Sequence, residues 1–250
     1  MPLWLQAGLW GLLAGSALLL GATVGFCARV KQRMVAAIMA FGSGVLVSAL
    51  SFDLMDEAFK RDGFISTSIG FLAGALVYTA ANVAINTRGA KHRKHSCDKH
   101  PSAEDTSGNV IAVGALIDGI PESIVIGISL IPGGAVGWVA VAAILLSNIP
   151  EGLSSSAGMK RVGRSARYVF GLWTTIALIS GLAALLGFVA FRHYSPSVIA
   201  ATTAVAAGGI LAMLVDTMIP EAFEQTHEFA GLITVVGFLL AFCATKLRVG

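Results

Sequence analysis

The sequence contains little charge. Only 12% of its 250 residues are charged, 56% are hydrophobic, and the mean hydropathy is +0.80. A soluble globular domain carries about 25% charged residues, so this composition excludes an ordinary soluble domain. Runs of the roughly 20 apolar residues that cross a bilayer core recur along the chain. We therefore predict an all-α, polytopic membrane protein with one transmembrane domain over residues 1–250.

Other scarce features exclude further classes of protein. The three cysteines, Cys27, Cys97 and Cys243, are too widely spaced for a disulfide framework. No basic stripe indicates nucleic-acid binding. The sequence has no Walker motif for ATP hydrolysis, and we expect the protein not to be an enzyme.

Eight apolar segments are expected, with boundaries good to a few residues. They lie at 3–26, 34–58, 64–86, 109–130, 135–158, 167–191, 197–222 and 229–247. Most of the 17 basic residues fall in alternate connections, around 29–33, 88–99 and 160–167. The positive-inside rule then places loop 87–108 in the cytoplasm and both termini outside a cell membrane.

The second and seventh segments share residues at a constant offset of 164. Gly44, Leu50 and Glu57 match Gly208, Leu214 and Glu221. The predicted topology sends these two segments across the membrane in opposite directions. We therefore expect an inverted repeat, with segments 1–3 related to 6–8 around segments 4 and 5, an architecture found in transporters. Chance similarity among Gly-, Ala- and Leu-rich helices is the competing explanation.

Two short motifs repeat each other in segments 4 and 5. Asp118-Gly119-Ile120-Pro121-Glu122-Ser123 and Ser147-Asn148-Ile149-Pro150-Glu151-Gly152 share Ile-Pro-Glu at an offset of 29 residues. No lysine or arginine lies deep in any segment to pair with these carboxyl groups. An ionised group at the bilayer centre costs about 2.5–3.5 kcal/mol. These carboxyl groups must be protonated or neutralised by a bound cation. We favour a cation site over protonated acids that only form packing hydrogen bonds.

Helical spacing sharpens this prediction. Asp118 and Glu122 share one helix face, as do Ser147 and Glu151, and Asn148 lies three residues before Glu151. Each proline lacks an N–H and leaves the carbonyl four residues earlier without its helical partner. The predicted metal site therefore has only oxygen donors of recognisable type, and its side chains are Asp118, Glu122, Ser147, Asn148 and Glu151.

Further polar residues outline a route to and from this site. We expect Asp53, Asp56 and Glu57 to guide cations in from outside, and Asp216, Glu221 and His227 to lie on the way to the cytoplasm. The cytoplasmic loop holds His92, His95, Cys97 and His100, which suit local capture of zinc or a similar metal. The alternatives are a solvated linker for the loop and an ordinary helix end around His227.

The motifs resemble those of the ZIP (Zrt/Irt-like protein) family of divalent metal transporters. That resemblance covers the whole chain and implies eight core spans, a His-rich loop after the third, and a central site on spans four and five. The family's fourth span usually reads His-Asn-x-Pro-Glu-Gly, but Asp118, Gly119 and Ser123 replace its His, Asn and last Gly here. The family implies Zn²⁺ as the substrate, whereas an all-oxygen site suits Mn²⁺, Mg²⁺ or Fe²⁺ somewhat better, and Co²⁺ or Cd²⁺ are further candidates.

The expected function is therefore the movement of divalent metal cations into the cytoplasm through a midplane carboxylate site. The expected partners are the metal ion and the lipid bilayer, with a homodimer as an open alternative and no nucleic acid. Two other functions stay open. The chain could be a metal sensor or scaffold that no longer transports, or an intramembrane aspartyl-type protease that uses Asp118.

Overall fold

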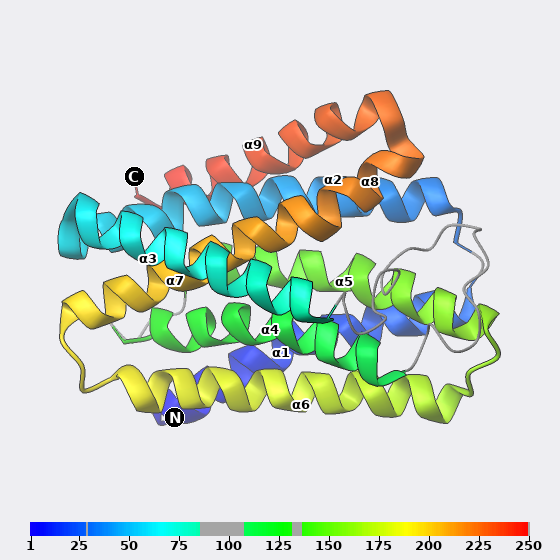
Figure 1. Cartoon of the computed structure of the whole chain (residues 1–250), viewed down its shortest axis with the longest axis horizontal. Helices are drawn as coiled ribbons and strands as arrows, with labels where there is room; N and C mark the ends of the chain where they lie inside the picture. The colour runs from blue at the N-terminus through cyan, green and yellow to red at the C-terminus, as the bar shows by residue number, and fades with distance from the viewer. Residues whose placement is uncertain (29, 86–107, 132–136, 250) are drawn as a thin grey trace.

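The computed structural model describes residues 1–28, 30–85, 108–131 and 137–249. Helices account for nearly all of these residues, and no strand occurs among them, which confirms the all-α prediction (Figure 1). The α-helices are α1 (Leu3–Cys27), α2 (Gln32–Ala49), α3 (Asp56–Ile85), α4 (Gly108–Ser129), α5 (Trp138–Arg161), α6 (Ala166–Phe191), α7 (Pro196–Met213), α8 (Ile219–Thr226) and α9 (Ala230–Val249). The described residues also form the π-helices η1 (Leu50–Met55) and η3 (Leu214–Met218) and the 3₁₀ turn η4 (His227–Phe229).

The chain reverses direction at Gly63 within α3. This residue has φ +75° and ψ −176°, a conformation that is essentially restricted to glycine. The sequence places a break between residues 58 and 64, but helix continues through 56–62 and the reversal occurs at this one glycine. Figure 1 shows α2 and the remainder of α3 running in opposite directions from this point.

Several helices are long and apolar enough to cross a membrane. Six such candidates occur among the described residues, and one of them, Gln32–Ala84, contains the reversal at Gly63. Their outer faces are apolar as well. On α6, for example, Leu178, Leu182 and Leu186 follow one another at four-residue spacing and are all more than half exposed. Soluble proteins rarely expose such continuous apolar stripes, so the helices are compatible with a multi-pass membrane protein.

Eight of the described glycines allow very close backbone contacts between helices, four of them where α1 meets α5 or α4 meets α6. A Cβ atom added at any of them would lie 1.8–2.2 Å from a carbonyl oxygen of the neighbouring helix. On α2 and α9 the pairs are Gly44 with Thr234 and Gly237 with Phe41, and on α7 and α3 they are Gly208 with Phe71 and Gly74 with Val205. Because no side chain fits between them, α2 with α9 and α3 with α7 are closely packed pairs.

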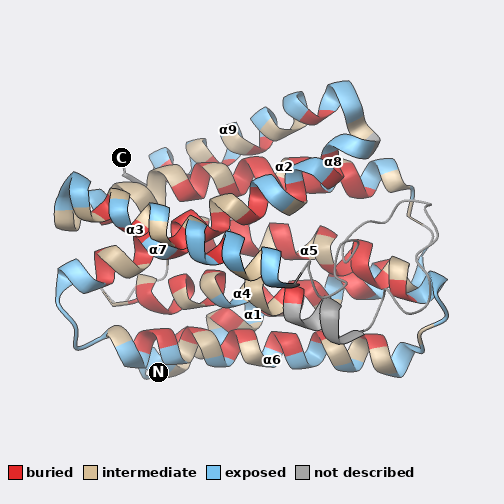
Figure 2. Ribbon diagram, viewed as in Figure 1, coloured by how far each residue is buried: buried red, intermediate tan, exposed pale blue. Residues whose placement is uncertain are grey.

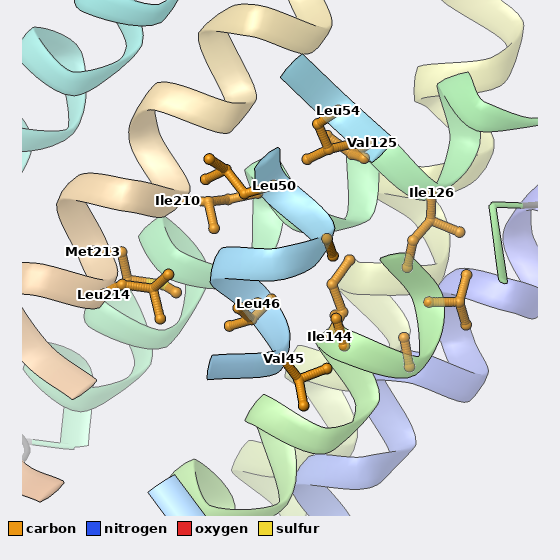
Figure 3. Close-up of a cluster of buried hydrophobic side chains, with 14 of the residues drawn as sticks. Val45, Leu46, Leu50, Leu54, Val125, Ile126, Ile144, Ile210, Met213 and Leu214 are labelled. Carbon is orange, nitrogen blue, oxygen red and sulfur yellow. The ribbon is translucent and has the colours of Figure 1, made fainter. Parts of the chain in front are cut away.

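The helices fall into two groups by their packing. The most extensive interfaces join α1 to α6, α1 to α5 and α4 to α6 in one group, and α3 to α7 and α2 to α9 in the other. Buried residues are frequent along α2, α5 and α7, whereas α9 is largely exposed (Figure 2). Apolar side chains of α2, η1, α4, α5 and α7, including Leu46, Leu50, Val125, Ile144 and Ile210, gather into one cluster across the boundary between the groups (Figure 3).

Candidate functional site

The two Pro-Glu motifs lie in the interior of the bundle. Pro121 is inside α4 and Pro150 is inside α5, and neither proline ends its helix. The side chains of Asp118, Glu122, Ser147 and Asn148 are buried, and Glu151 is half-buried. The predicted site residues are therefore placed at depth, on two helices that belong to the same packing group.

Asp118 accepts a hydrogen bond from another span. The hydroxyl of Tyr78 on α3 donates to Oδ1 of Asp118 at 2.9 Å, and both residues are buried. One turn further along α3, the amide of Asn82 donates to Oδ2 of Asp216 on η3 at 3.3 Å. Thus α3 supplies donors to carboxylates on two different segments. Sequence reasoning missed Tyr78 and Asn82, and only their four-residue spacing on one apolar helix could have indicated them.

Ser147 forms a hydrogen bond within α5, and Asn148 forms one that joins α5 to α1. The hydroxyl of Ser147 donates to the carbonyl of Ile144 at 2.9 Å. The amide nitrogen of Asn148 donates to the carbonyl of Ala14 on α1 at 2.9 Å. Asn148 therefore lies on the face of α5 that packs against α1, where Gly152 also meets the α1 backbone.

Glu151 lines a narrow pocket between α5 and the end of the seventh segment. Glu221 of α8 lines the same pocket, and the hydroxyl of Ser154 donates to its Oε1 at 2.6 Å, with both residues buried. The remaining lining residues include the thioethers Met39 and Met218 and the hydroxyls of Ser155 and Thr217. The structure thus brings together a predicted central residue, Glu151, and a predicted exit residue, Glu221, beside two methionines that the sequence could not place.

Ser154 also lines a larger pocket. This cavity of about 470 Å³ lies between the ends of α1 and α5 and the start of α2, and its walls include Gln32, Leu153, Lys160 and Arg161. Because Ser154 belongs to both linings, the narrow pocket at Glu151 and Glu221 adjoins the larger one.

The described residues do not form a cage of three carboxylates. No three His, Cys, Asp or Glu side chains among them lie close enough together to hold a metal ion. The acidic groups are instead distributed, with Asp118 and Glu122 on α4, and Glu151 and Glu221 across one pocket.

The remaining predicted route residues lie in several settings. Asp56 and Glu57 are close to half exposed and form i,i+4 ion pairs with Lys60 and Arg61, so basic side chains already neutralise them. Asp53 is partly buried on η1 and Asp216 is exposed on η3.

His227 is exposed at the turn between α8 and α9 with φ +44°, and its ring contacts that of Phe223. His92, His95, Cys97 and His100 lie outside the described residues.

Two comparisons with known proteins found no match. No protein-family model matches the chain, and no curated protein is similar to it. Its function has to be inferred from its own residues.

Proposed function

We propose that the chain is a multi-pass transporter of divalent metal cations, of the kind represented by the ZIP family that its motifs resemble. The observation that carries the proposal is the sign of the buried charge. All the fully buried charged residues in the described part of the chain, Asp118, Glu122 and Glu221, are acidic. Ionisable groups inside a membrane mark ion pathways by default, and acidic side chains suit a pathway for cations.

The proposed architecture has eight spans. Counting Gln32–Ala84 as two antiparallel spans joined at Gly63, and adding α4, raises the six candidates to eight. These spans are α1, α2 with η1, α3, α4, α5, α6, α7 with η3 and α8, and α9. The basic connections then face the cytoplasm, as the positive-inside rule requires, in a cell membrane.

Two observations support the inverted repeat. Both π-helices begin at residues separated by the sequence offset of 164, Leu50 and Leu214. The close glycine contacts follow the same relation. Gly44 on α2 contacts α9, the third helix of the second repeat, and Gly208 on α7 contacts α3, the third helix of the first repeat. Two bulges at one offset, with two glycine contacts at or within one residue of it, favour a repeat over chance similarity of small residues. π-helical bulges occur frequently at functional sites, and each one here contains an aspartate, Asp53 or Asp216.

The proposed route passes along the boundary between the two packing groups. A cation enters at Asp118 and Glu122 on α4, moves to Glu151 and then Glu221, and leaves through the larger pocket beside Ser154. Carboxylate and hydroxyl oxygens suit Mn²⁺ or Fe²⁺, and thioethers at Met39 and Met218 favour softer ions such as Cd²⁺, with Zn²⁺ suited by both. Access alternates when α1, α4, α5 and α6 slide against the other helices, since this boundary is less extensively packed than either group.

A paired-aspartate protease is less well supported. Asp118 is the single fully buried aspartate in the part of the chain that the structure describes, and its hydrogen-bond donor is a tyrosine. Transport is tested with purified protein in liposomes that contain a metal-sensitive dye. Uptake of Zn²⁺, Mn²⁺, Fe²⁺, Co²⁺ or Cd²⁺ above the rate of protein-free vesicles supports the proposal. Metal binding without flux of any of the five ions indicates the sensor or scaffold alternative.

A further inference from the structure

We propose that Tyr78 is a positioning residue that orients the Asp118 carboxylate for the cation. This inference rests on the proposed function, and it assigns a role to a residue that the sequence motifs do not include. Its hydroxyl donates to Oδ1 of Asp118 at 2.9 Å, and the two residues are 4% and 3% exposed, so water does not compete for the bond. The bond joins α3 to α4 across the boundary between the two packing groups.

Tyr78 lies between α7 and α4. α3 and α7 are in backbone contact, because Gly74 meets the carbonyl of Val205, and the Cβ of Tyr78 lies 3.9 Å from the position of a Cβ built on Gly209. On the other side, Tyr78 lines a mostly apolar cavity of about 340 Å³ with Ile117, Ile120 and Pro121 of α4. A hydrogen bond in such a low-dielectric setting is stronger than one in water.

The chemistry of the donor matters for a cation site. A neutral phenol can hold a buried carboxylate without occupying the place of a positive charge, whereas a lysine or arginine would compete with the metal ion. Fixing Oδ1 restricts the plane of the carboxylate, which lies one helical turn before Glu122 on α4. Carboxylates that bind metal ions are commonly oriented by such hydrogen bonds, and removal of the outer partner typically lowers affinity or activity about 10- to 100-fold.

The test is a double-mutant cycle on Zn²⁺ binding by the purified full-length protein, measured by titration calorimetry. We compare the parent, Tyr78→Phe, Asp118→Asn and the double variant. Tyr194→Phe is the matched control, since it removes a hydroxyl from an exposed tyrosine. We expect Tyr78→Phe to weaken Zn²⁺ binding about 10- to 100-fold, and to have no further effect once Asp118 is Asn. Unchanged affinity in Tyr78→Phe, or an equal loss in both backgrounds, overturns the proposal.

A second measurement leaves Tyr78 in place. In a Tyr168→Phe/Tyr194→Phe protein labelled with 3-fluorotyrosine, Tyr78 is the single labelled residue, because the chain has three tyrosines. We expect its ¹⁹F resonance to shift as Zn²⁺ is added and to saturate at the calorimetric Kd, and we expect no shift in the Glu122→Gln background. If the ¹⁹F chemical shift does not change as Zn²⁺ binds, the proposal is contradicted, even if Tyr78→Phe does not fold.

The outcomes separate this inference from the proposed function. If Tyr78→Phe weakens binding through Asp118 but liposomes show no flux, the transporter proposal fails and the role of Tyr78 stands. If the parent transports Zn²⁺ and Tyr78→Phe matches it in affinity, only the role of Tyr78 fails. If the parent transports Zn²⁺, we further expect Tyr78→Phe to raise the apparent KM for Zn²⁺ and to leave the yield of folded protein unchanged.

Discussion

Substitution of Gly208 by alanine tests the close packing of α7 on α3. The structure places the added Cβ 1.9 Å from the carbonyl oxygen of Phe71 and 2.8 Å from its carbonyl carbon. A real Cβ atom does not approach an oxygen this closely, and the obstacle is backbone, which cannot rotate away. The two helices must therefore separate in the variant.

The neighbouring residue provides a matched control. A Cβ at Gly209 would find its nearest atom, the carbonyl oxygen of Gly74, at an ordinary 3.7 Å. Overpacking a close-packed interior costs about 1–3 kcal/mol, and more where backbone has to move. In a helix interior, by contrast, Gly→Ala is favourable by up to about 1 kcal/mol when the space is free. The two adjacent substitutions are thus expected to have opposite signs.

The assay is thermal unfolding of the purified variants in detergent, followed by circular dichroism or by loss of monodisperse protein. For a chain of this size, about 1 kcal/mol corresponds to roughly 2–4 °C in Tm, so Gly208→Ala should lower Tm by roughly 2–12 °C. Gly209→Ala should leave Tm unchanged or raise it slightly. Equal Tm values for the two variants would refute the close α3–α7 contact, on which the proposed repeat also rests.

Three further predictions concern single residues. Ser154→Ala removes a donor from the buried Glu221 carboxylate and should destabilise the protein by about 1–3 kcal/mol in chemical unfolding, while an unchanged midpoint argues against the bond. Gly63→Ala strains the reversal by about 1–3 kcal/mol, which a lower Tm detects and an unchanged Tm contradicts. Asn148→Leu leaves the buried carbonyl of Ala14 without this donor, and a loss of about 1–3 kcal/mol in unfolding free energy is expected, whereas a more stable variant would show that the bond is dispensable.

Apolar runs and glycine predict much of this fold. Segment ends come within a few residues of the helices, because a span needs a fixed length of apolar sequence and its connections are polar. The sequence shows the shared offset of Gly44 and Gly208, because small residues are required wherever two helix backbones touch. The π-helices that begin at Leu50 and Leu214 could not be predicted from the sequence, because a π-bulge leaves the pattern of apolar residues nearly unchanged.

The candidate site was predictable only in part. Pro-Glu motifs identify α4 and α5, because a carboxylate in an apolar run is unusual on any helix. The partners of these carboxylates are set by tertiary packing, so neither Tyr78 with Asp118 nor Ser154 with Glu221 follows from spacing along the chain. Packing likewise sets the contact of the Asn148 amide with α1, which its position beside Glu151 in the sequence does not indicate.

The most direct test of the central claim is the initial rate of Zn²⁺ uptake by liposomes that contain the parent, Glu122→Gln or Glu151→Gln. Glu228→Gln is the control, because it makes the same chemical change at an exposed glutamate in η4. The two site variants should fall to the rate of protein-free vesicles while the control matches the parent. Uptake at the parent rate in both Glu122→Gln and Glu151→Gln would contradict a carboxylate route through the membrane.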